Sequence, residues 1–193
     1  ASAADTGVST GSFTISNATP SVSVVEVYDA SDLLTPVTSL TPQVMYFAKV
    51  TVSDANTVDD ITHITLKIFY DSDNSTPNDE SGVTAGDTQT AANITWTKSG
   101  NTTAIDAGGS TTWTVHTANS TIPTNMTASS GDWVIAFKVG TVATESLAPA
   151  KWVVHARAFD SLTSGGLYNR NKDVLWYGPI TVNTGSVSFG AVT

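Results

Sequence analysis

The sequence predicts an all-β fold: a single β-sandwich, Ig-like or of the jelly-roll type, with about ten strands. Short runs rich in Val, Ile, Thr and Trp alternate with stretches of Ser, Thr, Asn, Gly and Asp along the chain. No segment repeats apolar residues at i, i+3, i+4 and i+7, so we expect little helix. The 193 residues suit one domain, because sandwiches reach about 200–250 residues as single domains.

Strands are expected wherever apolar and polar residues alternate. The first, Ser12–Ser16, lies in an N-terminal extension, residues 1–20, which Pro20 separates from a sandwich domain of residues 21–193. The other expected strands are Val22–Tyr28, Val44–Val52, Ile61–Tyr70, Asn93–Lys98, Thr111–His116, Trp133–Val139, Lys151–Phe159, Val174–Val182 and Ser186–Val192. Two long loops are expected at Asp71–Thr90 and Ser161–Asp173.

The charge and the residue types exclude several classes of function. A net charge of −9 with only eight Lys plus Arg argues against binding to nucleic acid or to anionic lipid, which need a cationic face. The absence of cysteine removes disulfides, thiolate catalysis and cysteine-based metal sites. No apolar run approaches 18 residues, so we expect no membrane insertion. The opening residues Ala1–Ala4 are small, as around signal-peptidase sites, so we expect a secreted, extracellular protein at the cell surface.

No group of residues predicts catalysis. Gly7–Gly11 matches the G-x-S-x-G nucleophile motif, but that motif requires a following helix, which we do not expect here. His63 and His116 fall opposite the apolar faces of their strands, whereas His155 has apolar neighbours on both faces. We therefore predict that the protein is not an enzyme.

Two acidic runs are candidates for calcium binding, because calcium prefers six to eight oxygen ligands. The stronger candidate offers Asp71, Asp73 and Asp79 directly after a strand, and the second run spans Asp54–Asp60. Neither run has the glycine and terminal glutamate of an EF-hand in register. The alternative is an ordinary solvated turn, which also favours Asp and Asn.

Six Asn-x-Ser/Thr sequences are acceptors for N-linked glycans in a secreted protein. Those expected to carry glycans are Asn93, Asn101, Asn119 and Asn125, with Asn17 and Asn74 as weaker candidates. The acceptor sequences of the two weaker candidates end directly before Pro20 and Pro77. The five tryptophans all lie within expected strands, which predicts that they pack in the core. The alternative is an exposed aromatic face that stacks on sugars.

The run Val50–Ile64 resembles a loop of Ig-like domains in archaeal surface proteins, where a strand ends in Val-x-Asp and Asp-Asp-Ile leads into the next strand. Ala55 and Thr57 stand where Pro and Gly are frequent in those domains. The whole pattern is similar to archaeal secreted filament subunits, the threads and bundling pili. This resemblance implies a homopolymer in which a terminal strand of one subunit completes the sheet of the next.

The leading functional hypothesis is thus a structural subunit of an extracellular filament. The candidate donor strand comprises Ser12, Phe13, Thr14, Ile15 and Ser16, because Phe13 and Ile15 share one face and the other three share the opposite face. Ser186–Val192 is the alternative donor. The rival hypothesis is a secreted carbohydrate-binding or adhesin module.

Overall fold

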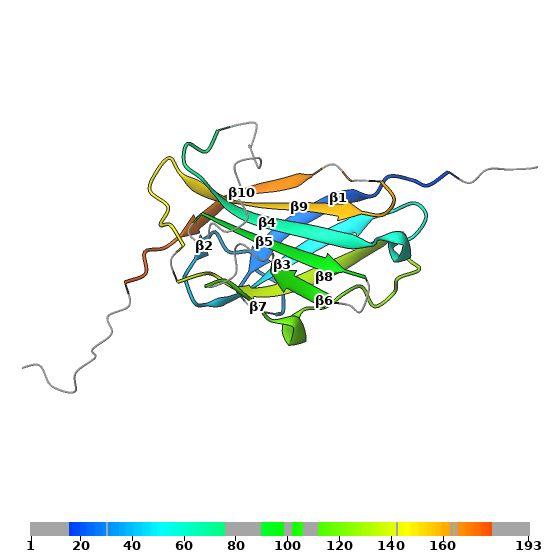
Figure 1. Cartoon of the computed structure of the whole chain (residues 1–193), viewed down its shortest axis with the longest axis horizontal. Coiled ribbons are helices and arrows are strands. Elements are labelled where there is room, and N and C mark those ends of the chain that lie inside the picture. The colour runs from blue at the N-terminus through cyan, green and yellow to red at the C-terminus, as the bar shows by residue number, and fades with distance from the viewer. Residues whose placement is uncertain are drawn as a thin grey trace, which may run out of the picture.

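The protein is a β-sandwich of two packed sheets (Figure 1). The computed structural model describes residues 16–29, 31–75, 90–98, 112–141, 143–162, 164 and 166–178, and the backbone of 102–105. The all-β sandwich predicted from the sequence is confirmed. In the described part of the chain the helical segments are two short 3₁₀ turns, η1 (Val58–Asp60) and η3 (Thr117–Asn119), and no helix there is long and apolar enough to cross a bilayer.

In the described part of the chain, one sheet has four strands. Their order is β1 (Ser21–Tyr28), β3 (Met45–Ser53), β8 (Ser130–Lys138) and β7 (Thr114–Val115). The ladder between β3 and β8 is antiparallel and runs in unbroken register from Met45↔Lys138 to Ser53↔Ser130. The ladder between β1 and β3 shifts register between Val22 and Val24, which makes Ser23 the extra residue of a β-bulge.

The second sheet has six strands among the residues that the structure describes. Their order is β2 (Ser39–Leu40), β10 (Leu167–Val174), β9 (Lys151–Phe159), β4 (His63–Asp71), β5 (Ala91–Thr97) and β6 (Thr102–Ile105). Short β2 runs parallel to β10 and covers only Asp173 and Val174 of its edge. The β10–β9 ladder also shifts register, between Asn169 and Lys172.

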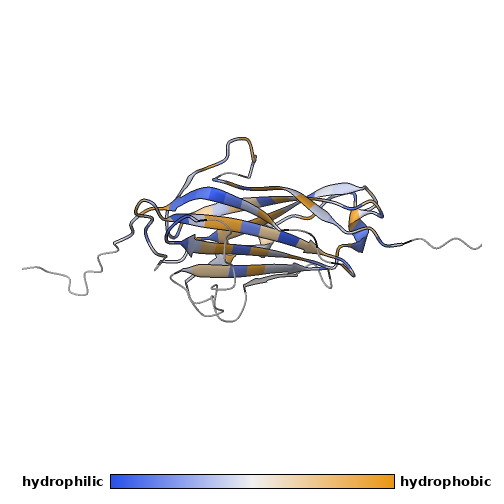
Figure 2. Ribbon diagram, turned by 90° about the horizontal axis from the view of Figure 1, so that it is seen from above, coloured by the Kyte–Doolittle hydropathy of each residue, from blue (hydrophilic) through white to orange (hydrophobic). Residues whose placement is uncertain are grey.

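The core lies between the sheets and follows the alternation of the strands, visible as changing colours along them in Figure 2. On β4, Ile64, Leu66 and Ile68 point inward and are fully buried. The outer faces also carry smaller apolar clusters. One comprises Tyr28, Phe47, Val134 and Ala136, and the other Phe69, Ala91 and Val153.

The structure corrects several expected boundaries. The loop expected at Ser161–Asp173 is wrong, because β10 occupies Leu167–Val174. The strand expected from Val174 is also wrong over residues 175–178, which are not in a strand. The strand expected at Thr111–His116 shrinks to Thr114–Val115, while β2 and β6 were not anticipated. The expected strands Ser12–Ser16 and Ser186–Val192 lie outside the described residues, apart from Ser16.

A candidate strand-acceptor groove

A shallow, widely open groove of about 520 Å³ lies between β1 and β10. β1 contributes Ser23–Val25 and β10 contributes Leu167–Asn171. Within the described part of the chain, each strand is hydrogen-bonded to a sheet neighbour on one side only over these residues: β1 to β3, and β10 to β9. Both uncovered edges therefore border the groove, and both carry a bulge there.

The uncovered edges present backbone groups and apolar side chains. The carbonyl oxygen of Val25 points away from β3 and accepts a hydrogen bond from Asn169 Nδ2 at 3.1 Å. Val24 is 37% exposed, and Leu167 and Tyr168 are half-buried in the opposite wall. A side chain thus satisfies the Val25 carbonyl oxygen on the free edge of β1. In a sheet with an added strand, a backbone N–H of that strand would donate to this oxygen instead.

A charged clip closes the groove at one end. The ammonium of Lys172 is fully buried and donates to Glu26 Oε1 and to the carbonyl oxygen of Val37, the latter at 2.6 Å. Asn169 Nδ2 donates to Glu26 Oε2 at 2.9 Å. These contacts join Glu26 of β1 to both Asn169 and Lys172 of β10.

Short hydrogen bonds anchor the point at which the N-terminal segment leaves the sandwich. The backbone N–H of Ala18 donates to Asn56 Oδ1 at 2.7 Å, and Asn17 Nδ2 donates to Asp160 and Ser161. Asn56 is in turn fixed by Asp54, whose Oδ1 accepts its backbone N–H at 2.8 Å. Ser16 is exposed, whereas Ser12, Phe13, Thr14 and Ile15 lie outside the described residues.

The turn around Asp54 bears on the resemblance to archaeal Ig-like domains. Thr57 has φ 154° and ψ 155°, a region that residues with a side chain rarely adopt. Glycine is frequent at this position in those domains, and the backbone here has a conformation that glycine adopts readily. Thr57 therefore occupies a turn whose shape suits glycine.

Two of the three acidic residues predicted to bind calcium lie in the described part of the chain. Asp71 accepts a hydrogen bond from Arg170 at 2.9 Å, so one of its oxygens is already paired with a cation. Asp73 accepts a hydrogen bond from Ser75, which lowers its pKa. Asp79 lies outside the described residues. Among the residues that the structure describes, no three His, Asp or Glu side chains come together as a metal site. Calcium binding stays a prediction.

The predicted glycan acceptors differ in accessibility. Asn17, Asn74, Asn119 and Asn125 are exposed. Asn93 is less accessible, because it is partly buried in the middle of β5, opposite Lys67 of β4. Asn101 lies outside the described residues. Glycosylation at all six positions stays a prediction, and the positions on turns are sterically the most open.

The histidines and tryptophans are mostly structural. His63 stacks on Phe159 with ring centroids 4.1 Å apart, and its partial burial lowers its pKa. His116 is half-buried, and His155 is buried and stacks on Tyr168. The prediction that tryptophans pack in the core is confirmed for Trp96, Trp113, Trp133 and Trp152. It is wrong for Trp176, which follows the end of β10 and is 71% exposed.

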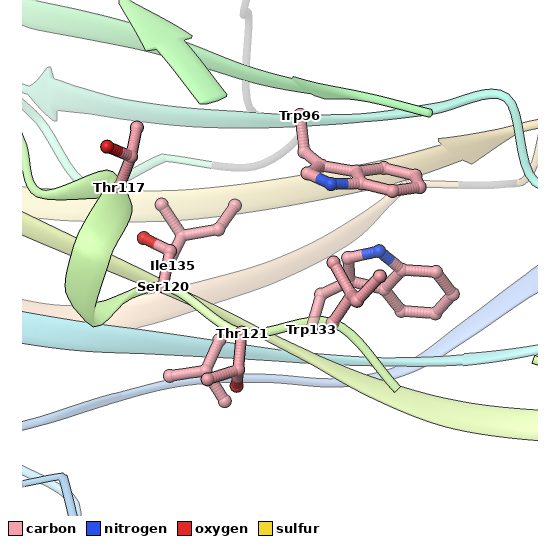
Figure 3. A pocket seen from close by; sticks show the side chains of 8 residues that line it. Trp96, Thr117, Ser120, Thr121, Trp133 and Ile135 are labelled. Carbon is pink, nitrogen blue, oxygen red and sulfur yellow. The ribbon is translucent and has the colours of Figure 1, made fainter. Parts of the chain in front are cut away.

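A partly open cavity beside the core is too small for a ligand. It measures about 20 Å³, enough for one water molecule, and lies beside Trp96, Ser120 and Trp133 (Figure 3). The indole nitrogen of Trp133 has no hydrogen-bond partner among the described residues, but it points toward the ring of Trp96 (Figure 3). The two rings are inclined at 63°, with their centroids 5.4 Å apart. The cavity is therefore a packing feature of the core.

Comparison of the sequence with models of known protein families and with curated proteins finds no match. The motif Gly7–Gly11 lies outside the described residues.

Proposed function

We propose that this chain is the structural subunit of an extracellular, pilus-like filament, in which a strand of one copy completes the groove of the next. The single observation that carries the proposal is the groove between the uncovered edges of β1 and β10. Uncovered strand edges pair readily with an added strand, and a contact between two different surfaces of one chain propagates into a fibre.

The chemistry of the groove suits an alternating strand. Backbone pairing supplies affinity without regard to sequence, whereas pockets for alternate side chains supply selectivity. Val25, which belongs to the core, and Leu167, which packs against the core, offer apolar contact on the inner side of the groove. The N-terminal donor presents Phe13 and Ile15 on one face. This pattern matches a groove whose inner side is apolar and whose outer side is open to water.

The length of the N-terminal segment permits transfer between copies. The described chain begins at one end of the sandwich and finishes at the other (Figure 1). Fifteen extended residues span roughly 50 Å, whereas a nine-residue strand spans roughly 30 Å. Residues 1–15 of one copy are thus long enough to run along the sandwich of a neighbour.

One observation favours a second candidate, a secreted carbohydrate-binding or adhesin module. Trp176 and Tyr177 are 71% and 38% exposed and adjacent in sequence. Exposed indoles stack on sugar faces. The two proposals differ in their partner, because a filament subunit binds its own N-terminal segment and a sugar-binding module does not.

The test is removal of residues 1–18. We expect the shortened chain to stay soluble, to form no filaments, and to bind a synthetic peptide of residues 1–18. A peptide carrying Phe13→Ser and Ile15→Ser is the matched control and should not bind. In the shortened chain, Val24→Lys should abolish peptide binding, whereas Thr114→Lys, on the opposite edge of the same sheet, should not.

Native filaments from the shortened chain would contradict donation by the N-terminal strand. In that case a chain shortened after Gly178 tests the alternative donor, Ser186–Val192. If neither shortened chain differs from wild type in assembly, and neither peptide binds, the proposal of strand donation is wrong.

A further inference from the structure

The root of the N-terminal segment, which we define as Asn17 and Ala18, is hydrogen-bonded to two loops of the sandwich. Asn17 Nδ2 donates to Asp160 Oδ2 and, at 2.7 Å, to Ser161 Oγ, so both hydrogens of this nitrogen have an acceptor. The backbone N–H of Ala18 donates to Asn56 Oδ1 at 2.7 Å. We call these three hydrogen bonds the latch. The latch joins the root to the loop between β3 and β4 and to the loop between β9 and β10.

The acceptors of the latch are held in place by their own loops. Asp54 is 2% exposed, its backbone N–H donates to the carbonyl oxygen of Ser129 at 2.9 Å, and its Oδ1 accepts the backbone N–H of Asn56 at 2.8 Å. In the other loop, the backbone N–H of Asp160 donates to the carbonyl oxygen of Leu162 at 3.1 Å. The backbone N–H of Leu162 donates to Asp160 Oδ1 in return. The latch therefore holds the root against two turns that are hydrogen-bonded internally.

The latch directs the root away from its own sandwich. β1 begins at Ser21, which lies opposite Ser53 at the end of β3. The loop after β9 follows Phe159, which lies opposite His63 at the start of β4. Both loops of the latch thus lie at the end of the sandwich where β1 begins. In Figure 1 the described chain before β1 continues outward from this end along the long axis, away from the groove between β1 and β10.

Without the latch, the donor segment has a shorter route into the groove of its own chain. Residues 17–20, Asn-Ala-Thr-Pro, have the length and the residue types of a four-residue hairpin loop. Such a hairpin places Thr14 opposite Ser23, on the edge of β1 that borders the groove. A strand tethered this closely has an effective concentration on the order of millimolar, so it competes strongly with the strand of another copy.

We propose that the latch keeps the N-terminal segment out of its own groove, so that the segment stays available to a second copy of the chain. This inference rests on the proposed function and adds the regulation of the same groove. A hairpin at residues 17–20 reverses the chain where the latch directs it outward, so the two states exclude each other. A glycan on Asn17 replaces one of the two hydrogens of Nδ2, so the latch requires an unmodified Asn17.

A disulfide placed across the hairpin measures how often the segment enters its own groove. The chain has no cysteine, so Thr14→Cys/Ser23→Cys allows one disulfide within a chain. The experiment uses dilute protein in which sedimentation velocity detects single chains. Mass spectrometry after mild oxidation measures the disulfide as the loss of two hydrogens. We expect little of this disulfide in the chain whose latch is intact.

Asn17→Asp, made in the same background, breaks the latch with a nearly isosteric change, because a carboxylate cannot donate to Asp160 and is repelled by it. We expect the disulfide within the chain to increase about fivefold or more, the ratio that corresponds to about 1 kcal/mol, or one hydrogen bond. In the chain without cysteines, Asn17→Asp should raise the concentration needed for filament formation by a similar factor.

Two further variants separate the latch from the added charge. Asn56→Asp adds the same charge but keeps an oxygen that accepts from Ala18, so it is the matched control and should behave like the intact latch. The swap Asn17→Asp/Asp160→Asn restores a donor and an acceptor in exchanged positions. It should return the disulfide to the level of the intact latch.

Equal amounts of the disulfide in the intact chain and in Asn17→Asp would overturn the inference, and so would an effect that the swap does not reverse. Native filaments in which every copy carries a glycan on Asn17 would also overturn it. The chain shortened by residues 1–18 has no root, so its binding to the peptide of residues 1–18 tests strand donation separately. Peptide binding without any effect of Asn17→Asp would leave strand donation intact and overturn the latch. An effect that the swap reverses, in a protein whose shortened chain does not bind the peptide, would support the latch and overturn strand donation.

Discussion

The charged clip between β1 and β10 should contribute substantially to stability. The change is Lys172→Met, which removes a fully buried ammonium and leaves Glu26 with Asn169 as its remaining partner in the clip. Removing one member of a buried ion pair costs about 3–5 kcal/mol. The Glu26 side chain is 20% exposed and keeps the bond from Asn169 at 2.9 Å, so we expect the lower limit, about 3 kcal/mol.

Thermal unfolding followed by circular dichroism measures this loss. A cost of 1 kcal/mol lowers Tm by about 2–4 °C in a domain of this size, so the expected decrease is roughly 6–12 °C. Lys151→Met is the matched control. It breaks the pair with Asp173, in which both side chains are 33% exposed, and exposed pairs contribute at most about 1 kcal/mol.

The double variant Glu26→Leu/Lys172→Met separates the lost attraction from the unpaired charge. Replacing both members of a buried pair by apolar residues is often neutral or stabilising. We therefore expect the double variant to recover most of the lost stability. The reasoning is refuted if Lys172→Met costs no more than Lys151→Met, or if the double variant is as unstable as the single one.

Two further predictions concern the ends and faces of the sandwich. Thr57→Gly should raise Tm by a few degrees. Glycine relieves a backbone strain of about 1–3 kcal/mol at this position, which exceeds the entropic cost of introducing glycine, about 0.4–1 kcal/mol. A decrease in Tm would contradict the presence of strain. Burial of Asp132 opposes its ionisation, but hydrogen bonds from Thr51 and Lys49 outweigh it and lower the pKa below the usual 3.8. The stability that these hydrogen bonds contribute is present above pH 3.8 and is lost as the pH falls through the lowered pKa. In Asp132→Asn, the midpoint of urea unfolding should therefore depend less on pH in this range.

The alternation of apolar and polar residues was sufficient to locate the central strands. The expected strands Val44–Val52 and Ile61–Tyr70 differ from β3 and β4 by one or two residues at each end. The expected strand Lys151–Phe159 agrees with β9. These strands have sheet neighbours on both sides, so their inward residues must be apolar and their pattern is regular.

The strands that escaped prediction, β2, β6 and β10, lie at or beside the edges of the six-stranded sheet, where packing constrains the sequence less, whereas the edge strand β1 was predicted to within one residue. β10 reads Leu-Tyr-Asn-Arg-Asn-Lys-Asp-Val, a polar stretch whose place in the sheet depends on pairing with β9 and not on its own pattern. Trp176 was expected inside a strand because it follows Val174 and Leu175, but β10 has already ended there.

The groove and its clip could not be anticipated from sequence. Glu26 and Lys172 are 146 positions apart, and neither has a local signal for burial. Their contact arises only when β1 and β10 come together at the side of the sandwich. The donor candidate, in contrast, could be chosen from sequence alone, because alternation at Phe13 and Ile15 is a local pattern.

The placement of the two chain ends has a mechanical consequence. Tension applied through the backbone enters and leaves the sandwich where the described chain begins and finishes, at opposite ends of its long axis (Figure 1). The force then acts along β1 and β10, so the ladder that holds β1 to β3 is sheared and its hydrogen bonds must break together. The bond between Lys172 and Glu26 links the two loaded strands directly. A pull can therefore pass from one sheet to the other without crossing the core, and the rate of forced unfolding should be sensitive to this one contact.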